Sequence, residues 1–375
     1  MEVVIGIQEA CQIAATIIII IPIFYWSIIN SISVPEIDRW RRADDEMDIS
    51  IILPMRNEKK NAIRKLDSMM PEILPVESTK LIVVDSFSSD GTGRIVRDYL
   101  SSSVLPESRW EIISLDVPGK SFAINRAMEE IDSEIIIMSD ADALISPGWM
   151  GYVIENLSNK EIGVVSGVES ENQKSLGGFN LYYRKRSNLL RKVESAIDST
   201  VVLEGSLIAW RVSSLGNFRL NENMNADDSQ IGLRSLRCGY RSIVDERIIF
   251  KDFDNNSRAF SESVRRSQGL SKALIINSGI LVSGERKKAR IAILNSLILY
   301  VPFPWAATIF SINAIIALSQ NFSVSLNWPF ISTSLMLVVL LTKQGRMLAR
   351  GIIISLVSHC QILLGKGYKT WDPIR

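Results

Sequence analysis

Two stretches of the chain contain no charged residue, residues 10–35 and residues 291–342. A helix needs about 20 apolar residues to cross a bilayer, and the first stretch has that length. The second is too long for one helix, so we expect two membrane helices joined by a polar turn at residues 319–323. A soluble helical hairpin is the alternative, but soluble domains rarely sustain such runs without charge.

Basic residues flank these stretches at residues 39–42, 286–288 and 343–350. Because basic loops stay in the cytoplasm, we expect three crossings, an outside N-terminus and a cytoplasmic C-terminus. Residues 351–365 are apolar but short, which favours an interfacial or re-entrant helix, and a fourth crossing stays open. The sequence therefore predicts a multi-pass protein of the cell membrane.

Charge and composition exclude several classes of protein. The chain has 42 basic and 41 acidic residues, so it lacks the basic field that nucleic-acid binding needs. Its three cysteines, Cys11, Cys238 and Cys360, lie far apart, which indicates neither a disulfide framework nor a zinc site. His359 is the only histidine, so mechanisms with a histidine base or a multi-histidine metal site are nearly excluded.

Between the apolar stretches, residues 48–255 alternate strand and helix patterns, which predicts an α/β fold with a mainly parallel sheet. Expected strands are residues 50–53, 80–84, 110–115, 134–138, 162–166 and 201–209. Expected helices are residues 58–70, 90–100, 120–131, 147–158 and 228–238.

An acidic pair, Asp140 and Asp142, follows the apolar strand at residues 134–138. Ligands of open α/β sheets bind at the carboxyl ends of strands. Two carboxylates there suit Mg²⁺ or a similar cation shared with substrate phosphates. Asp252 and Asp254 have the same spacing without a strand before them, so the context distinguishes the two pairs.

Other polar residues stand at expected strand ends and helix starts. Pro54, Arg56 and Glu58 follow the first strand, and Asp85, which could accept hydrogen bonds from a nucleobase, follows the second. Asp90 is better explained as a helix N-cap.

Lys120 opens the helix at residues 120–131, where its side chain could reach a nucleotide diphosphate. Asp227 and Asp228 open the helix at residues 228–238, and on this fragment alone we favour a capping role. A chain with one histidine that deprotonates a hydroxyl nevertheless needs a carboxylate base, and Asp228 is the best candidate.

Two stretches have the pattern of amphipathic helices. Residues 179–193 fit a membrane-surface helix and an ordinary surface helix equally well. Residues 261–280 favour the membrane surface because they lead into the span at residue 291. Arg265 and Arg266 lie in this second stretch, and they either neutralise a leaving diphosphate or face lipid headgroups.

The motifs together resemble the family-two inverting glycosyltransferases. They are Pro-x-Arg-Asn-Glu from Pro54, Val-Val-Asp-Ser-x-Ser-x-Asp-Gly-Thr from Val83, Gly-Lys-x-x-Ala-x-Asn-Arg-Ala from Gly119, Ser-Asp-Ala-Asp from Ser139 and Asp-Asp-x-x-Ile-x-x-Arg-x-x-x-x-Gly-Tyr from Asp227. Their joint order is far more specific than any one of them. The resemblance implies a GT-A fold, a nucleotide-binding α/β sandwich, between residues 50 and 240.

By position, the resemblance implies a role for each motif. The nucleoside pocket would be lined by Pro54, Arg56, Glu58 and Asp85, with Lys120 near the base or diphosphate. Asp140 and Asp142 would hold the nucleotide and its Mg²⁺ or Mn²⁺, and Asp228 would be the catalytic base. Asp227 replaces the family's usual glutamate, and with Arg265 and Arg266 it would contact diphosphate or acceptor.

One departure limits the resemblance. Processive membrane members carry Gln-x-x-Arg-Trp, whereas this chain has Glu-Ser-Val-Arg-Arg at residues 262–266, so chain polymerisation is not implied.

We therefore predict a membrane glycosyltransferase that moves a sugar from a UDP- or GDP-linked donor to a hydroxyl of a lipid or lipid-linked acceptor. Polyprenyl-phosphate glycosyl synthesis is the enzymatic alternative, and a catalytically silent nucleotide-sugar or lipid-binding subunit is the alternative outside enzymes.

The predicted organisation has five parts. They are a transmembrane helix at 1–35, a cytoplasmic GT-A domain at 48–255, interfacial helices at 256–290, two transmembrane helices at 291–342 and a C-terminal interfacial or re-entrant helix with a cytoplasmic tail at 343–375.

Overall fold

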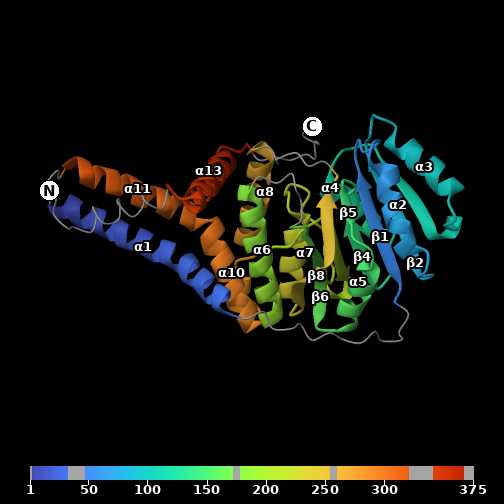
Figure 1. The fold of residues 1–375 in the computed structure, drawn as a ribbon, viewed down its shortest axis with the longest axis horizontal. Coiled ribbons are helices and arrows are strands. Elements are labelled where there is room, and N and C mark those ends of the chain that lie inside the picture. The colour runs from blue at the N-terminus through green and yellow to red at the C-terminus, as the bar shows by residue number, and fades with distance from the viewer. Residues whose placement is uncertain (1, 33–46, 172–177, 254–259, 321–340, 367–375) are drawn as a thin grey trace. The chain divides into compact units, whose positions relative to one another are not determined.

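The computed structural model describes residues 2–32, 47–171, 178–253, 260–320 and 341–366 (Figure 1). The basic flank at 39–42, the turn from residue 321 onwards and nearly all of the second span in 291–342 lie outside these residues. The chain forms two compact units. The helical unit comprises Met1–Ser33, Arg258–Ile275 and Leu294–Gly367, and the sheet unit comprises Val34–Ser257, Ile276–Ile293 and Tyr368–Arg375.

In the described part of the sheet unit, the strands form one eight-stranded sheet in the order β3-β2-β1-β4-β7-β6-β8-β5. β1 pairs in parallel with both β2 and β4, and β2 pairs in parallel with β3. β7 runs antiparallel to β4 and β6, so the parallel half of the sheet ends there. The strands are β1 (Ile49–Met55), β2 (Thr79–Ser86), β3 (Trp110–Leu115), β4 (Ile135–Ser139), β5 (Ala143–Ile145), β6 (Ile162–Glu169), β7 (Leu207–Arg211) and β8 (Arg241–Asp252).

Apolar residues cover both faces of this sheet, which confirms the predicted α/β fold with a mainly parallel sheet. Successive side chains of a strand point to opposite faces, so Ile51 and Leu53 of β1 enter one core while Ile52 enters the other. Helices close each core. One core takes residues from α2 (Ala62–Ile73), α3 (Thr92–Ser102) and α5 (Trp149–Ser158), and the other from α4 (Lys120–Met128) and α7 (Asp227–Arg237). The sheet unit also contains α6 (Gly178–Ile197) and the short α9 (Ile280–Ser283).

The expected strand at residues 201–209 is corrected to Leu207–Arg211. Residues 201–206 instead form a loop whose polar groups bond to neighbouring strands: Ser166 Oγ donates to the Glu204 carbonyl (2.9 Å) and Ser139 Oγ to the Ser206 carbonyl (2.6 Å). β5 and β8 were not predicted: β5 is short, and β8 mixes apolar and charged residues that the apolar pattern does not mark. β8 runs to Asp252, so the expectation that no strand precedes Asp252 is wrong.

The helix α6 covers residues 179–193, whose sequence fits a membrane-surface helix and an ordinary surface helix equally well. Its basic residues pair with acidic residues of the same unit. Arg184 pairs with Glu169, and Arg191 Nη2 lies 2.7 Å from Glu204 Oε1. Burial of Arg191 and Glu169 shows that part of the basic face points into the sheet unit, which supports the ordinary packed helix.

The helical unit contains α1 (Glu2–Ser31), α8 (Phe260–Ile276), α11 (Pro302–Gln320) and α13 (Lys343–Leu363), and α10 (Lys287–Tyr300) leads into α11. Two of its described helices, at Ala10–Ser31 and Gly345–Leu363, are long and apolar enough to cross a membrane. A third span results if α10 and the first part of α11, bent by 45° at Val301, count as one.

Two details differ from expectation. The bend in the span after residue 291 was not foreseen, although Pro302 begins the new helix at that point and cannot donate to the preceding turn. The last helix is longer than predicted because the polar residues from Lys343 onwards are helical, and the Thr342 side chain caps them by accepting from the Gly345 amide (2.9 Å).

His359 is a buried packing residue, as its apolar surroundings predict. Trp305 Nε1 donates to His359 Nδ1 (3.1 Å), and His359 Nε2 lies 3.2 Å from Ser271 Oγ. It thereby ties α13 to α11 and α8.

Candidate active site

The carboxyl ends of β1, β2 and β4 meet at one edge of the sheet because the three strands are parallel and paired in register. Asp85 lies at the end of β2, and Asp140 follows β4 directly. The sequence prediction that these acidic residues share an edge with Pro54 and Arg56 of the first strand end therefore agrees with the topology.

Two loops at this edge are joined by hydrogen bonds. The Asn57 amide donates to Ser88 Oγ (2.9 Å), and the Ser89 amide donates to Asn57 Oδ1 (2.9 Å). The Glu58 amide donates to Thr92 Oγ1 (2.9 Å). Arg56 and Glu58 are thus half-buried in a loop that the start of α3 supports.

The N-cap of α3 is Gly91 rather than the predicted Asp90, although the Asp90 side chain still binds the first amide of the helix. Asp90 Oδ1 accepts from the Thr92 amide (3.0 Å) at the start of α3, and its Oδ2 accepts from the Lys59 amide (3.1 Å) of the neighbouring loop.

Asp85 is half-buried, and its Oδ1 accepts from the Ser88 amide (3.1 Å). A methyl group on Gly93 would overlap its Oδ2, so only glycine lets α3 approach this carboxylate. The side chain is therefore held by both its loop and the following helix.

Lys120, the first residue of α4, joins two of the predicted acidic residues. Its Nζ lies 2.7 Å from Asp140 Oδ1 and 2.9 Å from Asp227 Oδ2. Burial lowers the pKa of Lys120, but the two carboxylates more than reverse this and hold the pKa above its ordinary value, so the side chain stays charged. Its position depends on Gly119, whose amide donates to Ser86 Oγ (3.0 Å) at the end of β2.

Gly205 marks the point where the predicted residues converge. A methyl group on its Cα would lie 3.4 Å from Lys120 Nζ, 3.6 Å from Asp228 Oδ2 and 3.8 Å from Asp140 Oδ2. Asp140 and Asp228, which are far apart in the sequence, therefore border the same small space.

Asp228 has the most perturbed carboxylate of this cluster. Burial, together with the negative charge of Asp227, raises its pKa to about 7, although Lys120 and the Ser229 amide oppose the shift. A carboxylate with a pKa near neutrality can accept a proton from a substrate and release it to solvent.

The loop before Asp227 is positioned by two amide side chains that the sequence analysis assigned no role. Asn125 of α4 donates to the Leu220 carbonyl (2.9 Å) and accepts from the Leu220 amide (2.8 Å). Gln230 Oε1 accepts from the Asn221 amide (2.8 Å). Asn125 belongs to the motif that begins at Gly119, and this membership is the sequence feature that could have indicated its role.

A buried lysine beneath the acidic pair was also missed. Lys65 of α2 is fully buried, and its Nζ lies 2.7 Å from both Ser139 Oγ and the Ala143 carbonyl oxygen. Burial lowers its pKa to about 7, while the charges of Asp140 and Asp142 act in the opposite direction. The sequence does contain a signal for this buried position, because Lys65 lies on the same helix face as the apolar residues Ala62, Leu66 and Met69.

The donor set at Asp140 and Asp142 fits a hard divalent cation. The Asp140 side chain is 27% exposed and Asp142 is exposed, so both can reach a ligand in solution. Within the described residues, no three histidine, cysteine or acidic side chains form a complete metal cage. The pair therefore suits a cation that takes its remaining ligands from substrate phosphates and water.

Arg265 and Arg266 lie on α8, which belongs to the helical unit, whereas the other predicted site residues belong to the sheet unit. Arg266 Nη2 lies 3.0 Å from Glu262 Oε1, one turn earlier on the same helix. The contact of either arginine with diphosphate stays a prediction.

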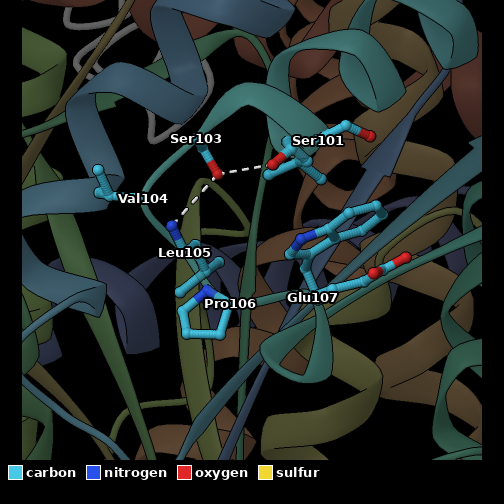
Figure 2. A pocket seen from close by; sticks show the side chains of 8 residues that line it. Ser101, Ser103, Val104, Leu105, Pro106 and Glu107 are labelled. Carbon is cyan, nitrogen blue, oxygen red and sulfur yellow. Dashed lines mark hydrogen bonds between the residues drawn. The ribbon is translucent and has the colours of Figure 1, made fainter.

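A cavity of about 310 Å³ lies elsewhere on the sheet unit, between the end of α3 and the start of β3 (Figure 2). It is lined by Leu100, Ser101, Ser103, Val104, Leu105, Pro106, Glu107 and Trp110. Trp110 begins β3, so this cavity lies at the edge opposite the strand ends that carry the acidic cluster.

Known proteins resemble this chain in sequence and fold. Residues 50–208 match the family model described as glycosyl transferase family 2. A probable glycosyltransferase of Bacillus subtilis, YdaM, is 28% identical over 133 residues, which cover 33% of this chain and 30% of that protein. The match thus spans under a third of the relative's length.

Two solved structures share the fold. The mannosyltransferase PcManGT of Pyrobaculum calidifontis, in complex with GDP-Man and Mn²⁺, has a TM-score of 0.78 at 22% identity, covering 96% of this chain and 99% of that one. TarS 1–349 of S. aureus, with UDP-GlcNAc, has a TM-score of 0.50 at 14% identity, covering 87% and 94%. The family match covers less than half of the chain, so residues 50–208 resemble glycosyl transferase family 2, and the solved structures show that the fold is of the GT-A type.

Proposed function

We propose that this chain is an inverting, metal-dependent hexosyltransferase attached to a membrane. It transfers a sugar from a UDP- or GDP-linked donor to a hydroxyl of a lipid or lipid-linked glycan. The observation that carries the proposal is the meeting of Asp228, Asp140 and Lys120 around Gly205.

The donor lies across the strand ends. Arg56, Glu58 and Asp85 face the nucleoside, with Pro54 beneath them, and Lys120 and the acidic pair face the diphosphate. Asp140 and Asp142 would hold Mg²⁺ or Mn²⁺, which when bound would supply positive charge against the departing diphosphate. PcManGT was solved with a nucleotide-sugar and Mn²⁺, and TarS with a nucleotide-sugar, which supports this choice of donor and cation.

Asp228 accepts the proton of the acceptor hydroxyl. The hydroxyl oxygen then forms a bond to the anomeric carbon as the bond to the diphosphate oxygen breaks, which inverts that carbon. Burial and Asp227 give the carboxylate of Asp228 a raised pKa and therefore more basic strength than an ordinary aspartate has.

Because Asp228 can act as a base, we prefer a hydroxyl acceptor to a polyprenyl phosphate. A phosphate is already anionic and needs no base. The lipid character of the acceptor is supported by Ala10–Ser31 and Gly345–Leu363, two helices with the length and hydropathy of membrane spans, so we place the protein in the cell membrane with its sheet unit in the cytoplasm.

The test is donor turnover and product analysis with full-length protein, membrane lipid extract and a panel of nucleotide-sugars. Asp228→Asn should lower kcat by about a hundredfold or more while retaining donor binding. The matched control is Asp98→Asn on the exposed surface of α3. Transfer by Asp228→Asn at the wild-type rate excludes a base at this position, and absence of turnover by the wild type favours a silent binding subunit.

A further inference from the structure

Lys65 holds both ends of the acidic turn. Ser139 is the last residue of β4 and Ala143 the first of β5, and Asp140, Ala141 and Asp142 lie between them. The Lys65 ammonium donates to Ser139 Oγ and to the Ala143 carbonyl, each at 2.7 Å. The Lys65 side chain thus connects the residue before the acidic turn with the residue after it.

The donors and acceptors of this arrangement are consistent. Ser139 Oγ donates its proton to the Ser206 carbonyl (2.6 Å), so towards Lys65 it acts as an acceptor. The same carbonyl accepts from the Asp140 amide (3.3 Å). Lys65, Ser139 and Ser206 therefore connect α2, the acidic turn and the loop that carries Gly205.

A fully buried lysine is costly unless its ammonium is paired. Two short hydrogen bonds satisfy the Lys65 ammonium, and the charges of Asp140 and Asp142 offset part of the burial cost, which still lowers the pKa of Lys65 to about 7. A leucine or methionine would fit the apolar face of α2 without this cost, so packing alone does not explain the lysine.

We propose that Lys65 is a positioning residue for the cation site: it fixes the turn from beneath so that the carboxylates of Asp140 and Asp142 face one divalent cation. The inference rests on the proposed function, and it assigns the ammonium no contact with substrate. Residues that orient metal ligands typically change metal affinity by about 10–100-fold when they are replaced.

The experiment compares wild type, Lys65→Met and Ser139→Ala as full-length proteins. Mn²⁺ binding is titrated by electron paramagnetic resonance without donor, and amide hydrogen exchange of residues 139–143 is measured without metal. Lys160→Met, which removes an exposed lysine beyond α5, is the matched control. Thermal unfolding of each variant checks that it is folded.

We expect Lys65→Met to weaken Mn²⁺ binding about tenfold or more and to speed exchange in the turn. Ser139→Ala should act in the same direction with a smaller effect, and it tests the inference if Lys65→Met does not fold. Lys160→Met should match the wild type.

The direction of the change is decisive, because removing a positive charge by itself tightens cation binding. Unchanged or tighter binding in Lys65→Met, or unchanged exchange in the turn, overturns the positioning role while leaving the proposed function intact. Failure of the wild type to bind Mn²⁺, even with UDP or GDP present, overturns both.

Discussion

Lys120 Nζ lies 2.7 Å from Asp140 Oδ1, so a protein cation pairs with a carboxylate that we assign to the metal. The pair joins the first turn of α4 to the end of β4 and neutralises part of the acidic cluster. Binding of a metal and diphosphate would offer Asp140 a stronger partner and leave the lysine free to contact the diphosphate.

The first prediction concerns this competition. Lys120→Met should tighten Mn²⁺ binding several-fold in the absence of donor because the competing cation is lost. It should weaken UDP or GDP binding about tenfold or more, since a charged hydrogen bond to phosphate is worth about 1.5–3 kcal/mol. Calorimetric titration of each ligand checks both effects, and weaker Mn²⁺ binding would contradict the competition.

The second prediction concerns the pH dependence of transfer. In the wild type, kcat/KM should rise with pH through about 7 as Asp228 loses its proton. The negative charge of Asp227 helps to raise this pKa, so Asp227→Asn should move the rise to lower pH. The ratio of kcat/KM at pH 6 to that at pH 8 measures the shift. An identical ratio in both proteins would mean that Asp228 is not the titrating group.

The third prediction concerns stability. Burial raises the pKa of Asp228 in the folded protein to about 7, whereas an unfolded aspartate has a pKa of about 4, so its effect on folding changes between these values. Below about pH 4 both states hold the proton. As pH rises towards 7 the unfolded state loses its proton first, which destabilises the folded protein by up to about 4 kcal/mol.

Asp228→Asn cannot ionise and escapes this destabilisation. Its melting temperature should exceed that of the wild type by several degrees at pH 8, with a much smaller difference at pH 4.5. Thermal unfolding in detergent without metal or donor provides the measurement. A pH-independent difference would show that the Asp228 carboxylate is not the origin.

The fourth prediction concerns the space at Gly205. A methyl group there meets Lys120 Nζ, Asp228 Oδ2 and Asp140 Oδ2 only at ordinary contact distances of 3.4–3.8 Å, so Gly205→Ala should fold normally. If the proposed function holds, it should nevertheless lower transfer at least tenfold, because the methyl group would occupy the space in which the proposed substrate meets the cluster. Gly151→Ala on α5, where nothing lies within 4 Å, is the control and should keep full activity.

Much of the sheet unit could be predicted from local pattern. The strands β1 to β4 and the helices between them lie within a few residues of the predicted ranges, because buried parallel strands are continuous apolar runs. β5 and β8 were not predicted because they form by pairing antiparallel with each other across a long stretch of intervening chain. The composition of either segment does not reveal that pairing.

The long apolar helices show a similar division between what the sequence predicts and what it does not. Charge-free length predicted the long helix at α1, but it did not reveal the bend at Val301 or the helical start of α13, because both depend on backbone hydrogen bonds at single positions.

The amino-acid sequence by itself determined which residues could carry chemistry: the acidic pair after β4, the lysine opening α4 and the two aspartates opening α7. Only the tertiary structure decided that Asp140, Lys120 and Asp228 meet around Gly205, and that Lys65 lies buried beneath the acidic turn. The physical reason is that the sequence pattern reports the burial and periodicity of each segment. The distance between charges on separate segments is decided by sheet order, and that order depends on contacts between residues remote in the chain.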